Sequence, residues 1–325
     1  MTQTLVGLAE IRAAAERVRA IARVTPLLDV SAAAGRALFL KCESLQPAGA
    51  FKIRGAYNMV AQLTDDQRRR GVITYSSGNH GQAMALAARE LGAPAVVVMP
   101  TTAPRIKIEG ARGFGAEIIL EGTTSADRRT RAEQEAAARG LTMVPPFDHE
   151  WIIAGQGTAG LEILDQKPDV AAVLVPVGGG GLVSGVAAAI KQVNPRVKLI
   201  GVEPAGAAKM RASLEAGHPV TLDRTQSVAD GLMPVRPGDL TFAHVQKFVD
   251  DVVTVDDSKI VAAVLWIFEK AKIVAEPSGA ATVAAALAGL ADRHADGGPI
   301  VAIVSGGNMA LDKLTELRAS MTNDQ

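Results

Sequence analysis

Short, nearly continuous apolar runs recur along this chain, and most are followed by a turn and a segment of helical character. The apolar runs occupy residues 72–75, 95–99, 117–120, 172–177, 199–202 and 300–304. Helical character is strongest at residues 83–91, 125–139 and 182–192. Strands that are apolar on both faces are typical of parallel sheets covered by helices, and their alternation with helices requires right-handed crossovers. The pattern therefore predicts an α/β fold with parallel-type sheets flanked by helices.

The composition limits the functions that such a fold can serve. The chain has 325 residues, which is enough for two domains, and its Lys+Arg and Asp+Glu counts of 34 each give a formal net charge of +0. Because this balance gives no general attraction to nucleic acids or acidic membranes, and aromatic residues make up only 3%, neither partner is expected. The single cysteine, Cys42, excludes an internal disulfide. Without a secretory signal or a membrane-spanning run, a soluble cytoplasmic protein is expected.

Four consecutive glycines, Gly178, Gly179, Gly180 and Gly181, follow one apolar run and lead into a helix that Leu182 opens. Without Cβ atoms, the backbone N–H groups of such a turn can converge on an anion at the helix N-terminus. A tight turn alone needs fewer glycines, which favours a bound phosphate. The loop lacks the patterns of dinucleotide-binding and ATP-binding motifs. It therefore predicts a site for a smaller phosphorylated cofactor.

Lys52 directly follows Phe51, after the small-residue turn Ala48-Gly-Ala. A lysine at the start of a helix is usually a solvated surface charge. A lysine that is desolvated among apolar neighbours has a lowered pKa, and it can then form a Schiff base with a carbonyl compound. The local sequence leaves both roles open, because it does not show whether the side chain is buried.

Two further strand ends carry polar residues, and ligands collect at the carboxyl ends of parallel strands. Ser76, Ser77, Asn79 and His80 follow the first predicted strand. These side chains suit recognition of a carboxylate or a ring hydroxyl, and they suit ordinary helix capping equally well. His80 by itself is more typical of a packed, hydrogen-bonded histidine than of a base. Ser305 follows the last predicted strand, where it would donate to a ring nitrogen or cap a turn.

Together these segments resemble the fold-type II pyridoxal-phosphate enzymes, specifically the threonine/serine dehydratase and serine racemase group. The matches occur in the family's order over almost the whole chain, and the ordered set is specific although each segment is short. The matching segments are Thr25-Pro-Leu, Phe51-Lys-Ile-Arg-Gly-Ala, Ser76-Ser-Gly-Asn-His, Pro176-Val-Gly-Gly-Gly-Gly, Gly201-Val-Glu-Pro, Ala229-Asp-Gly, Arg236-Pro-Gly, Glu276-Pro-Ser-Gly and Ser305-Gly-Gly-Asn. The resemblance implies a large cofactor-binding domain of residues 1–70 and 150–325, a small domain of residues 71–149, and a homodimer.

The resemblance also implies pyridoxal 5'-phosphate as the cofactor and gives the predicted residues their roles. Lys52 would hold the cofactor as a Schiff base and later move the substrate α-proton, with Phe51 packed against the pyridine ring. Asn79 would bond the phenolic oxygen of the ring, and Ser305 would meet its nitrogen. The phosphate would be held by Gly178, Gly179, Gly180, Gly181 and Leu182. The substrate carboxylate would be surrounded by Ser76, Ser77, Asn79 and His80.

The reaction that the resemblance implies is the loss of water from L-threonine or L-serine, giving a 2-oxo acid and ammonia. A neutral Ser305 at the ring nitrogen makes a weaker electron sink than an aspartate, which favours expulsion of a β-leaving group over transamination. Ser77 departs from the dehydratases, which have alanine there, and matches the racemases, in which this serine is an acid/base on the opposite face of the cofactor. Dehydratase is the primary hypothesis, with serine racemase and 3-hydroxyaspartate dehydratase as alternatives.

Two features concern regulation. Lys209 stands where racemase-like metal sites have a second carboxylate, near the oxygens that Glu203 and Ala207 offer. An ammonium there can replace a cation electrostatically, so no metal site is predicted and activation by divalent ions is expected to be weak or absent. The sequence ends at Gln325, soon after the last motif, and we expect no isoleucine-sensing domain.

Two other classes of protein remain as alternatives. A phosphate-binding sensor or carrier of the same fold would not need Lys52 to lose its charge. A β-replacement synthase, such as a cysteine synthase, shares the fold but joins a nucleophile such as sulfide to the substrate. The segments Arg236-Pro-Gly and Ser76-Ser-Gly-Asn-His favour a dehydratase over such a synthase.

Overall fold

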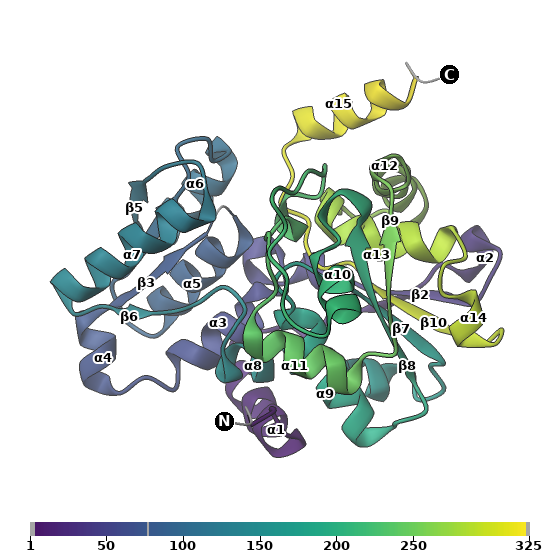
Figure 1. The fold of residues 1–325 in the computed structure, drawn as a ribbon, viewed down its shortest axis with the longest axis horizontal. Coiled ribbons are helices and arrows are strands. Elements are labelled where there is room, and N and C mark those ends of the chain that lie inside the picture. Colours follow the sequence, from purple (N-terminus) through teal and green to yellow (C-terminus); the bar gives the residue numbers. More distant parts are fainter. Residues whose placement is uncertain (1–3, 77, 323–325) are drawn as a thin grey trace.

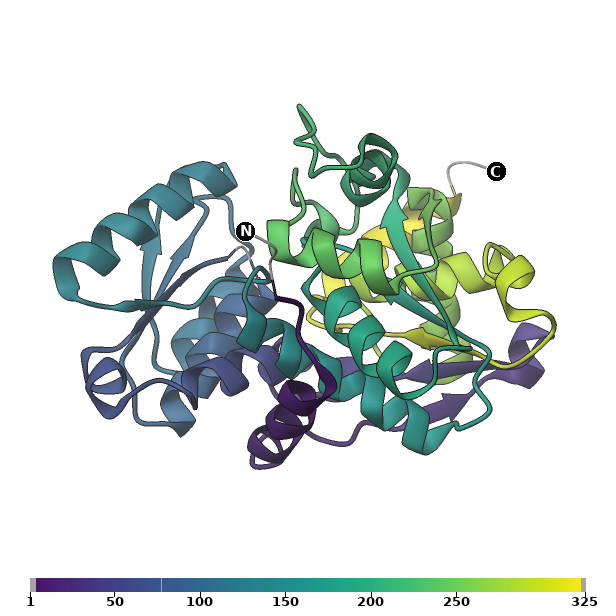
Figure 2. The same cartoon turned by 60° about the horizontal axis from the view of Figure 1, so that its bottom comes forward.

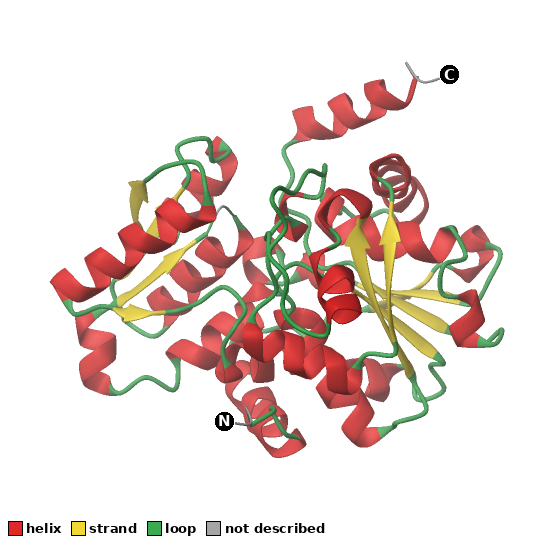
Figure 3. Cartoon of the chain, viewed as in Figure 1, coloured by secondary structure: helices red, strands yellow, loops and turns green. Residues whose placement is uncertain are grey.

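The structure is a computed structural model that describes residues 4–76 and 78–322. Its strands form two sheets, one of six strands and one of four. The two sheets lie side by side in both Figure 1 and Figure 2. Helices cover them, as the colouring of Figure 3 makes clear. The arrangement confirms the predicted α/β class with parallel-type sheets flanked by helices.

The six-stranded sheet has the order β1-β2-β10-β7-β8-β9, and its neighbouring strands are parallel except for β1 and β2. Its strands are β1 (Leu27–Asp29), β2 (Leu38–Lys41), β7 (Ala172–Pro176), β8 (Lys198–Pro204), β9 (Asp251–Val255) and β10 (Ile300–Ile303). Every residue of β7 and β10 is buried. Burial on both faces is the physical reason that these strands are continuous apolar runs in the sequence.

The four-stranded sheet has the order β5-β4-β3-β6 and is parallel throughout. Its strands are β3 (Val72–Tyr75), β4 (Ala95–Met99), β5 (Glu117–Leu120) and β6 (Thr142–Met143). This sheet lies within the interval 71–149, for which the family resemblance implies a small domain, and the domain boundary itself stays a prediction. The core beneath the sheet also includes Ile53 and Val60 from an earlier helix.

The α-helices of the described residues pack around these sheets and between them. They are α1 (Leu8–Val18), α2 (Ser31–Ala34), α3 (Lys52–Val60), α4 (Asp65–Arg70), α5 (Asn79–Glu90), α6 (Arg105–Gly113), α7 (Ser125–Arg139), α8 (Glu150–Gln166), α9 (Gly181–Val193), α10 (Lys209–Ala216), α11 (Asp239–Phe248), α12 (Asp257–Trp266), α13 (Pro277–Leu287), α14 (Asp292–Ala295) and α15 (Leu311–Thr322). The short helical turns are η1 (Glu43–Leu45), η2 (Pro47–Gly49), η3 (Ala205–Ala207), η4 (Asp230–Leu232) and η5 (Ile267–Ala271).

The helices α3, α8 and α9 approach one another closely, and glycines permit it. A Cβ added to Gly155 of α8 would lie 2.6 Å from the backbone oxygen of Arg54 in α3. A Cβ added to Gly185 of α9 would lie 2.2 Å from the backbone oxygen of Ile153 in α8. Because larger residues would push these helices apart, the glycines bring the start of α3 near the start of α9.

None of the helices within residues 4–76 and 78–322 is long and apolar enough to cross a membrane. The predicted strands match β3, β4, β5, β7, β8 and β10, and the three predicted helices match α5, α7 and α9. The helix α5 begins at Asn79, four residues before the predicted start. The strands β1, β2, β6 and β9 were not predicted, because they are short or carry charged residues such as Lys41 and Asp251.

Candidate active site

Lys52 is the first residue of α3, and its side chain is partly buried. Its Nζ donates a hydrogen bond to the backbone oxygen of Pro146 at 2.7 Å and lies 5.1 Å from the centre of the Phe51 ring. Burial lowers the pKa of Lys52 to about 8. In the described part of the chain, no carboxylate forms an ion pair with it. A larger share of this lysine is therefore neutral near physiological pH than of an exposed lysine, which makes it a better nucleophile.

The segment that carries Lys52 is attached to the end of β10. The backbone N–H of Phe51 donates to the backbone oxygen of Ser305 at 3.0 Å, and Ala50 pairs with Gly306 in an isolated antiparallel bridge. Ser305 is 4% exposed and lies two residues beyond the strand. The predicted lysine and the predicted ring-nitrogen partner therefore come together at the carboxyl end of a central parallel strand, where ligands bind in such sheets.

The glycine run forms the turn between β7 and α9. Gly180 has a φ of +103°, which disfavours any residue with a side chain. The backbone oxygen of Gly179 accepts hydrogen bonds from Thr241 Oγ1 at 2.7 Å and from the N–H of Gly238 at 3.2 Å. The N–H groups of Gly178, Gly179 and Gly180 have no acceptor among the described residues. Unpaired donors at a helix N-terminus are a ready site for an anion.

Pro146 and Phe147 connect this loop with the lysine. A Cβ on Gly179 would lie 2.3 Å from the ring of Phe147, and the preceding residue accepts the hydrogen bond from Lys52. The glycine turn, called the glycine cradle below, and the amine of Lys52 thus lie against two adjacent residues of one segment. These groups fit a cofactor that carries both a phosphate and an aldehyde. Leu182, buried in the first turn of α9, anchors the helix behind the cradle.

Asn79 and His80 form the first turn of α5. Asn79 Nδ2 donates to Glu276, and Asn79 Oδ1 accepts from Asn308 Nδ2 at 3.0 Å. His80 Nε2 lies 3.1 Å from the backbone oxygen of Val144, so Nε2 carries the proton. Burial and the charge of Lys52 lower the pKa of His80 to about 3. His80 is therefore a neutral, packed residue.

The structure describes one of the other two predicted residues of this loop, Ser76. Ser76 Oγ accepts a hydrogen bond from the N–H of Gly78 at 3.1 Å and thereby shapes the turn before α5. Ser77, the predicted acid/base, lies outside the described residues. Its role therefore stays a prediction from the sequence.

Three charged residues beside the site were not predicted. Lys107 of α6 is 6% exposed, and its Nζ pairs with Asp230 of η4. Burial raises the pKa of Glu276 to about 7, opposed by the charge of Lys107 and assisted by that of Asp230. Glu276 and Asp230 lie within segments that resemble the family, which was the available signal. Lys107 had no local signal, because its partner is 123 positions away.

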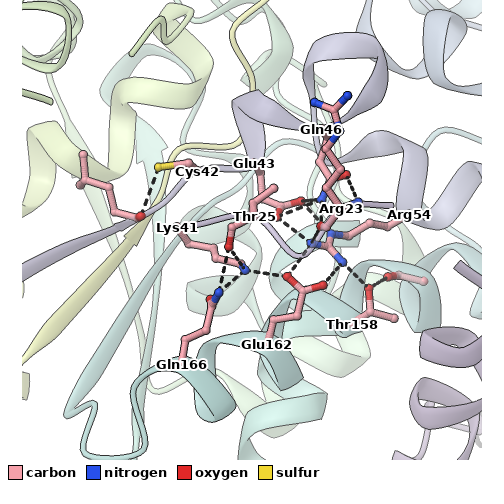
Figure 4. A network of polar contacts seen from close by, with 12 residues as sticks. Arg23, Thr25, Lys41, Cys42, Glu43, Gln46, Arg54, Thr158, Glu162 and Gln166 are labelled. Atoms are coloured by element: carbon pink, nitrogen blue, oxygen red, sulfur yellow. Dashed lines mark hydrogen bonds and ion pairs between the residues drawn. The ribbon is translucent and has the colours of Figure 1, made fainter. Parts of the chain in front are cut away.

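A buried network of charges holds α3 in place (Figure 4). Arg54 Nε donates to Glu43 Oε2 at 2.7 Å, and its two terminal nitrogens donate to the Glu162 oxygens at 2.6 and 2.8 Å. Lys41 Nζ donates to Glu162 at 2.6 Å, and Thr25 Oγ1 donates to Glu43 at 2.6 Å. Two cations offset two carboxylates, so the charges remain compensated although they are buried. Since Arg54 lies two residues after Lys52, in the first turn of α3, this network fixes that turn.

Comparison with known sequences places this site in a family. The model of the family described as pyridoxal-phosphate dependent enzyme matches residues 18–306. The L-threonine ammonia-lyase of Thermotoga maritima is 45% identical over 288 residues, which cover 89% of this chain and 71% of that protein. The serine racemase of Oryza sativa subsp. indica is 42% identical over 312 residues, covering 94% and 92%. This chain spans only 58% of the biosynthetic L-threonine dehydratase of Pasteurella multocida, to which it is 43% identical.

Solved structures agree with the sequence comparison. The structure of maize serine racemase has a TM-score of 0.92 and 39% identity, with 99% of each chain covered. The processed form of threonine deaminase isoform 2 from Solanum lycopersicum has a TM-score of 0.91 and 40% identity, covering 97% of this chain and 90% of that one. The family match covers most of the chain, including the lysine and the glycine cradle, so this chain belongs to the pyridoxal-phosphate dependent enzymes.

Proposed function

We propose that this chain is an L-threonine/L-serine dehydratase, which removes water from a β-hydroxy amino acid and releases a 2-oxo acid and ammonia. The observation that carries the proposal is the position of Lys52, a partly buried lysine that has no carboxylate partner among the described residues and whose segment is bonded to Ser305 near the glycine cradle. A relative at 45% identity is an L-threonine ammonia-lyase, which supports the same reaction.

The residues of the chain divide the work between binding and proton transfer. Pyridoxal phosphate, when bound, supplies a ring that withdraws electrons from the substrate Cα. Lys52 Nζ would bind the aldehyde of the cofactor and, once free again, would accept the Cα proton. The N–H groups of Gly178–Gly181 and Leu182 would hold the phosphate, and Phe51 would flank the ring. A neutral Ser305 at the ring nitrogen favours the loss of a β-hydroxyl over transamination.

The loop at the start of α5 would bind the substrate carboxylate. Ser76 and Asn79 offer a hydroxyl and an amide there, and contacts with Glu276 and Asn308 hold the amide in place. A neutral His80 would shape this loop without acting as a base, since its Nε2 proton is already committed to a backbone oxygen. Orientation of Cα–H toward Lys52 would follow from these contacts.

Serine racemase is the second candidate. Two observations favour it: the serine racemases of rice and maize match this chain over 92% and 99% of their own lengths, and the resemblance implies that Ser77 matches the serine of the racemases. We also propose, from the resemblance, a small domain of residues 71–149, a homodimer and a cytoplasmic location.

An assay of the holoenzyme with several substrates tests the proposal. L-threonine and L-serine are expected to release 2-oxo acid and ammonia in equal amounts, whereas O-acetylserine with sulfide is expected to give no cysteine. D-serine formed from L-serine, measured by chiral chromatography, would identify racemase activity. 3-Hydroxyaspartate as the better substrate would favour that dehydratase instead. Absence of 2-oxo acid release from both L-threonine and L-serine would overturn the proposal.

A pair of variants separates the two candidates. Ser77→Ala is expected to abolish any D-serine formation and to leave release of 2-oxo acid from L-threonine within about tenfold of the parent. The reason is that a proton donor on the face of the cofactor opposite Lys52 is needed for racemisation and not for loss of water. Ser258→Ala, which alters an exposed serine of α12, is the matched control and should change neither activity. Equal loss of both activities in Ser77→Ala would refute a role confined to racemisation.

A further inference from the structure

Another buried lysine, Lys209, lies in a cage of oxygen atoms behind the glycine cradle. Its Nζ donates to the backbone oxygens of Val177 at 2.7 Å, Leu232 at 2.9 Å and Ala207 at 3.2 Å, and it lies 2.9 Å from Glu203 Oε1. The side chains of Lys209 and Glu203 are both 0% exposed. Three carbonyl acceptors require three protons on the nitrogen, so the geometry specifies an ammonium ion.

The oxygens of this cage come from segments that meet at the proposed cofactor site. Val177 directly precedes the glycine run, and Leu232 ends η4, which begins at Asp230. A Cβ added to Gly178 would lie 2.9 Å from the backbone oxygen of Gly231, so η4 already touches the loop. Lys209 therefore joins the phosphate cradle to the segment whose aspartate pairs with Lys107.

Glu203 fixes the other side of the cage. Its two oxygens accept the backbone N–H groups of Met210 at 3.0 Å and Arg211 at 2.9 Å, which lie in the first turn of α10. The carboxylate thus binds the start of α10 to the end of β8, and it offsets the charge of Lys209 within the protein.

The cage resembles the environment of a hard cation rather than that of a surface lysine. Carbonyl and carboxylate oxygens are the ligands that Mg²⁺ and Ca²⁺ prefer. Here an ammonium already sits among them, and it would repel a divalent ion. The described residues contain no cluster of three acidic, histidine or cysteine side chains that could hold a metal ion. These residues therefore do not fit the metal site that the resemblance to racemases suggests.

We propose that Lys209 is a built-in cation that takes the place of a divalent metal ion and positions the glycine cradle against η4. The proposal rests on the proposed cofactor site, but not on the identity of the substrate. Lys209 is thus a positioning residue, since it acts on the phosphate-binding N–H groups through Val177 and does not touch the cofactor itself.

The test replaces the ammonium of Lys209 with a carboxylate that can bind an added metal ion. Thermal unfolding of wild-type apoprotein is expected to be the same in EDTA and in MgCl₂. Lys209→Asp supplies a second carboxylate beside Glu203, so its melting temperature is expected to fall in EDTA and to recover in MgCl₂ or CaCl₂. Stabilisation of the wild type by these ions, or absence of recovery in Lys209→Asp, would overturn the proposal.

Cofactor affinity gives a second measurement that does not depend on turnover. Lys209→Met is expected to weaken pyridoxal phosphate binding by about tenfold or more, because it removes hydrogen bonds from a charged donor that hold the cradle. Addition of MgCl₂ to Lys209→Asp should restore the affinity. If Lys209→Met does not fold, Lys209→Asp with and without MgCl₂ decides the question alone.

The matched control is Lys198→Met, which alters a half-exposed lysine paired with Asp250 at the start of β8. It should change neither the melting temperature in MgCl₂ nor the cofactor affinity. If Lys209→Met leaves the cofactor affinity unchanged, as Lys198→Met does, the result would contradict the role of Lys209. Failure of the threonine assay with normal cofactor binding would count only against the proposed reaction.

Discussion

Lys209 is fully buried and Lys52 is partly buried, and the two lysines differ in the groups that surround their amines. Lys209 faces the Glu203 carboxylate and three backbone oxygens, whereas Lys52 has one backbone oxygen and no carboxylate among its described neighbours. Burial lowers the pKa of both lysines, but at Lys209 a carboxylate opposes the shift. The pKa of Lys52 falls to about 8 because burial acts on it alone.

The difference teaches how one protein assigns two tasks to the same residue type. A buried lysine with a carboxylate remains an ammonium and serves as a structural cation. A poorly solvated lysine that has no carboxylate partner loses its proton more readily and is then a better nucleophile. Lys41 follows the first pattern, since its Nζ pairs with Glu162 in the network behind α3. Burial alone therefore does not distinguish Lys52 from these lysines, and the lack of a carboxylate partner is what supports its proposed role.

The largest expected effect is a loss of activity when the amine of Lys52 is removed. Lys52→Ala should lower activity by about 10²–10⁴-fold or more, because it removes both the covalent anchor and the base. Borohydride reduction of the wild-type holoenzyme, followed by peptide mass spectrometry, should find pyridoxal phosphate on Lys52 and not on Lys41 or Lys209. Label on either of those two residues would contradict the assignment. Lys270→Ala, an exposed lysine, is the control.

A second variant removes the charges that position Lys52. Arg54→Met leaves Glu43 buried without its arginine, so the free energy of unfolding in urea should fall by about 3–5 kcal/mol. Arg19→Met breaks an ion pair whose side chains are 75% and 66% exposed, and it should change that free energy by about 1 kcal/mol or less. Similar losses in the two variants would show that the buried network has no special role.

The smallest expected effect is a dependence of cofactor uptake and of apoprotein stability on pH, which tests the lowered pKa of Lys52. Only the neutral amine attacks the aldehyde, so the rate at which the apoprotein takes up pyridoxal phosphate should rise about tenfold per pH unit below pH 8 and level off above it. The folded pKa lies below the ordinary value of 10.5, so the unfolded chain binds the proton more tightly between about pH 8 and 10.5. Lys52 therefore makes the stability of the apoprotein rise with pH across that window. A rate midpoint near 10.5 would contradict the lowered pKa.

Sequence patterns were informative where the cause is local. The runs at 95–99 and 172–177 identified β4 and β7 because strands buried on both faces carry apolar residues at every position. The short strands β1 and β6 have two or three residues and no such pattern. In the site, Lys52, Asn79, Ser305 and the glycine run were all named beforehand, mainly because the ordered motifs resemble the family.

The sequence by itself determined the α/β class, the glycine turn and the set of polar residues at the strand ends, since these depend on neighbours within a few positions. Only the tertiary structure showed that Lys41 and Lys209 each have a carboxylate partner, whereas the amine of Lys52 has a backbone oxygen. The partners that matter come from distant segments: Glu162 for Lys41, Asp230 for Lys107, and Pro146 for Lys52. A pKa depends on burial and on the charges nearby in space, and no local pattern records either.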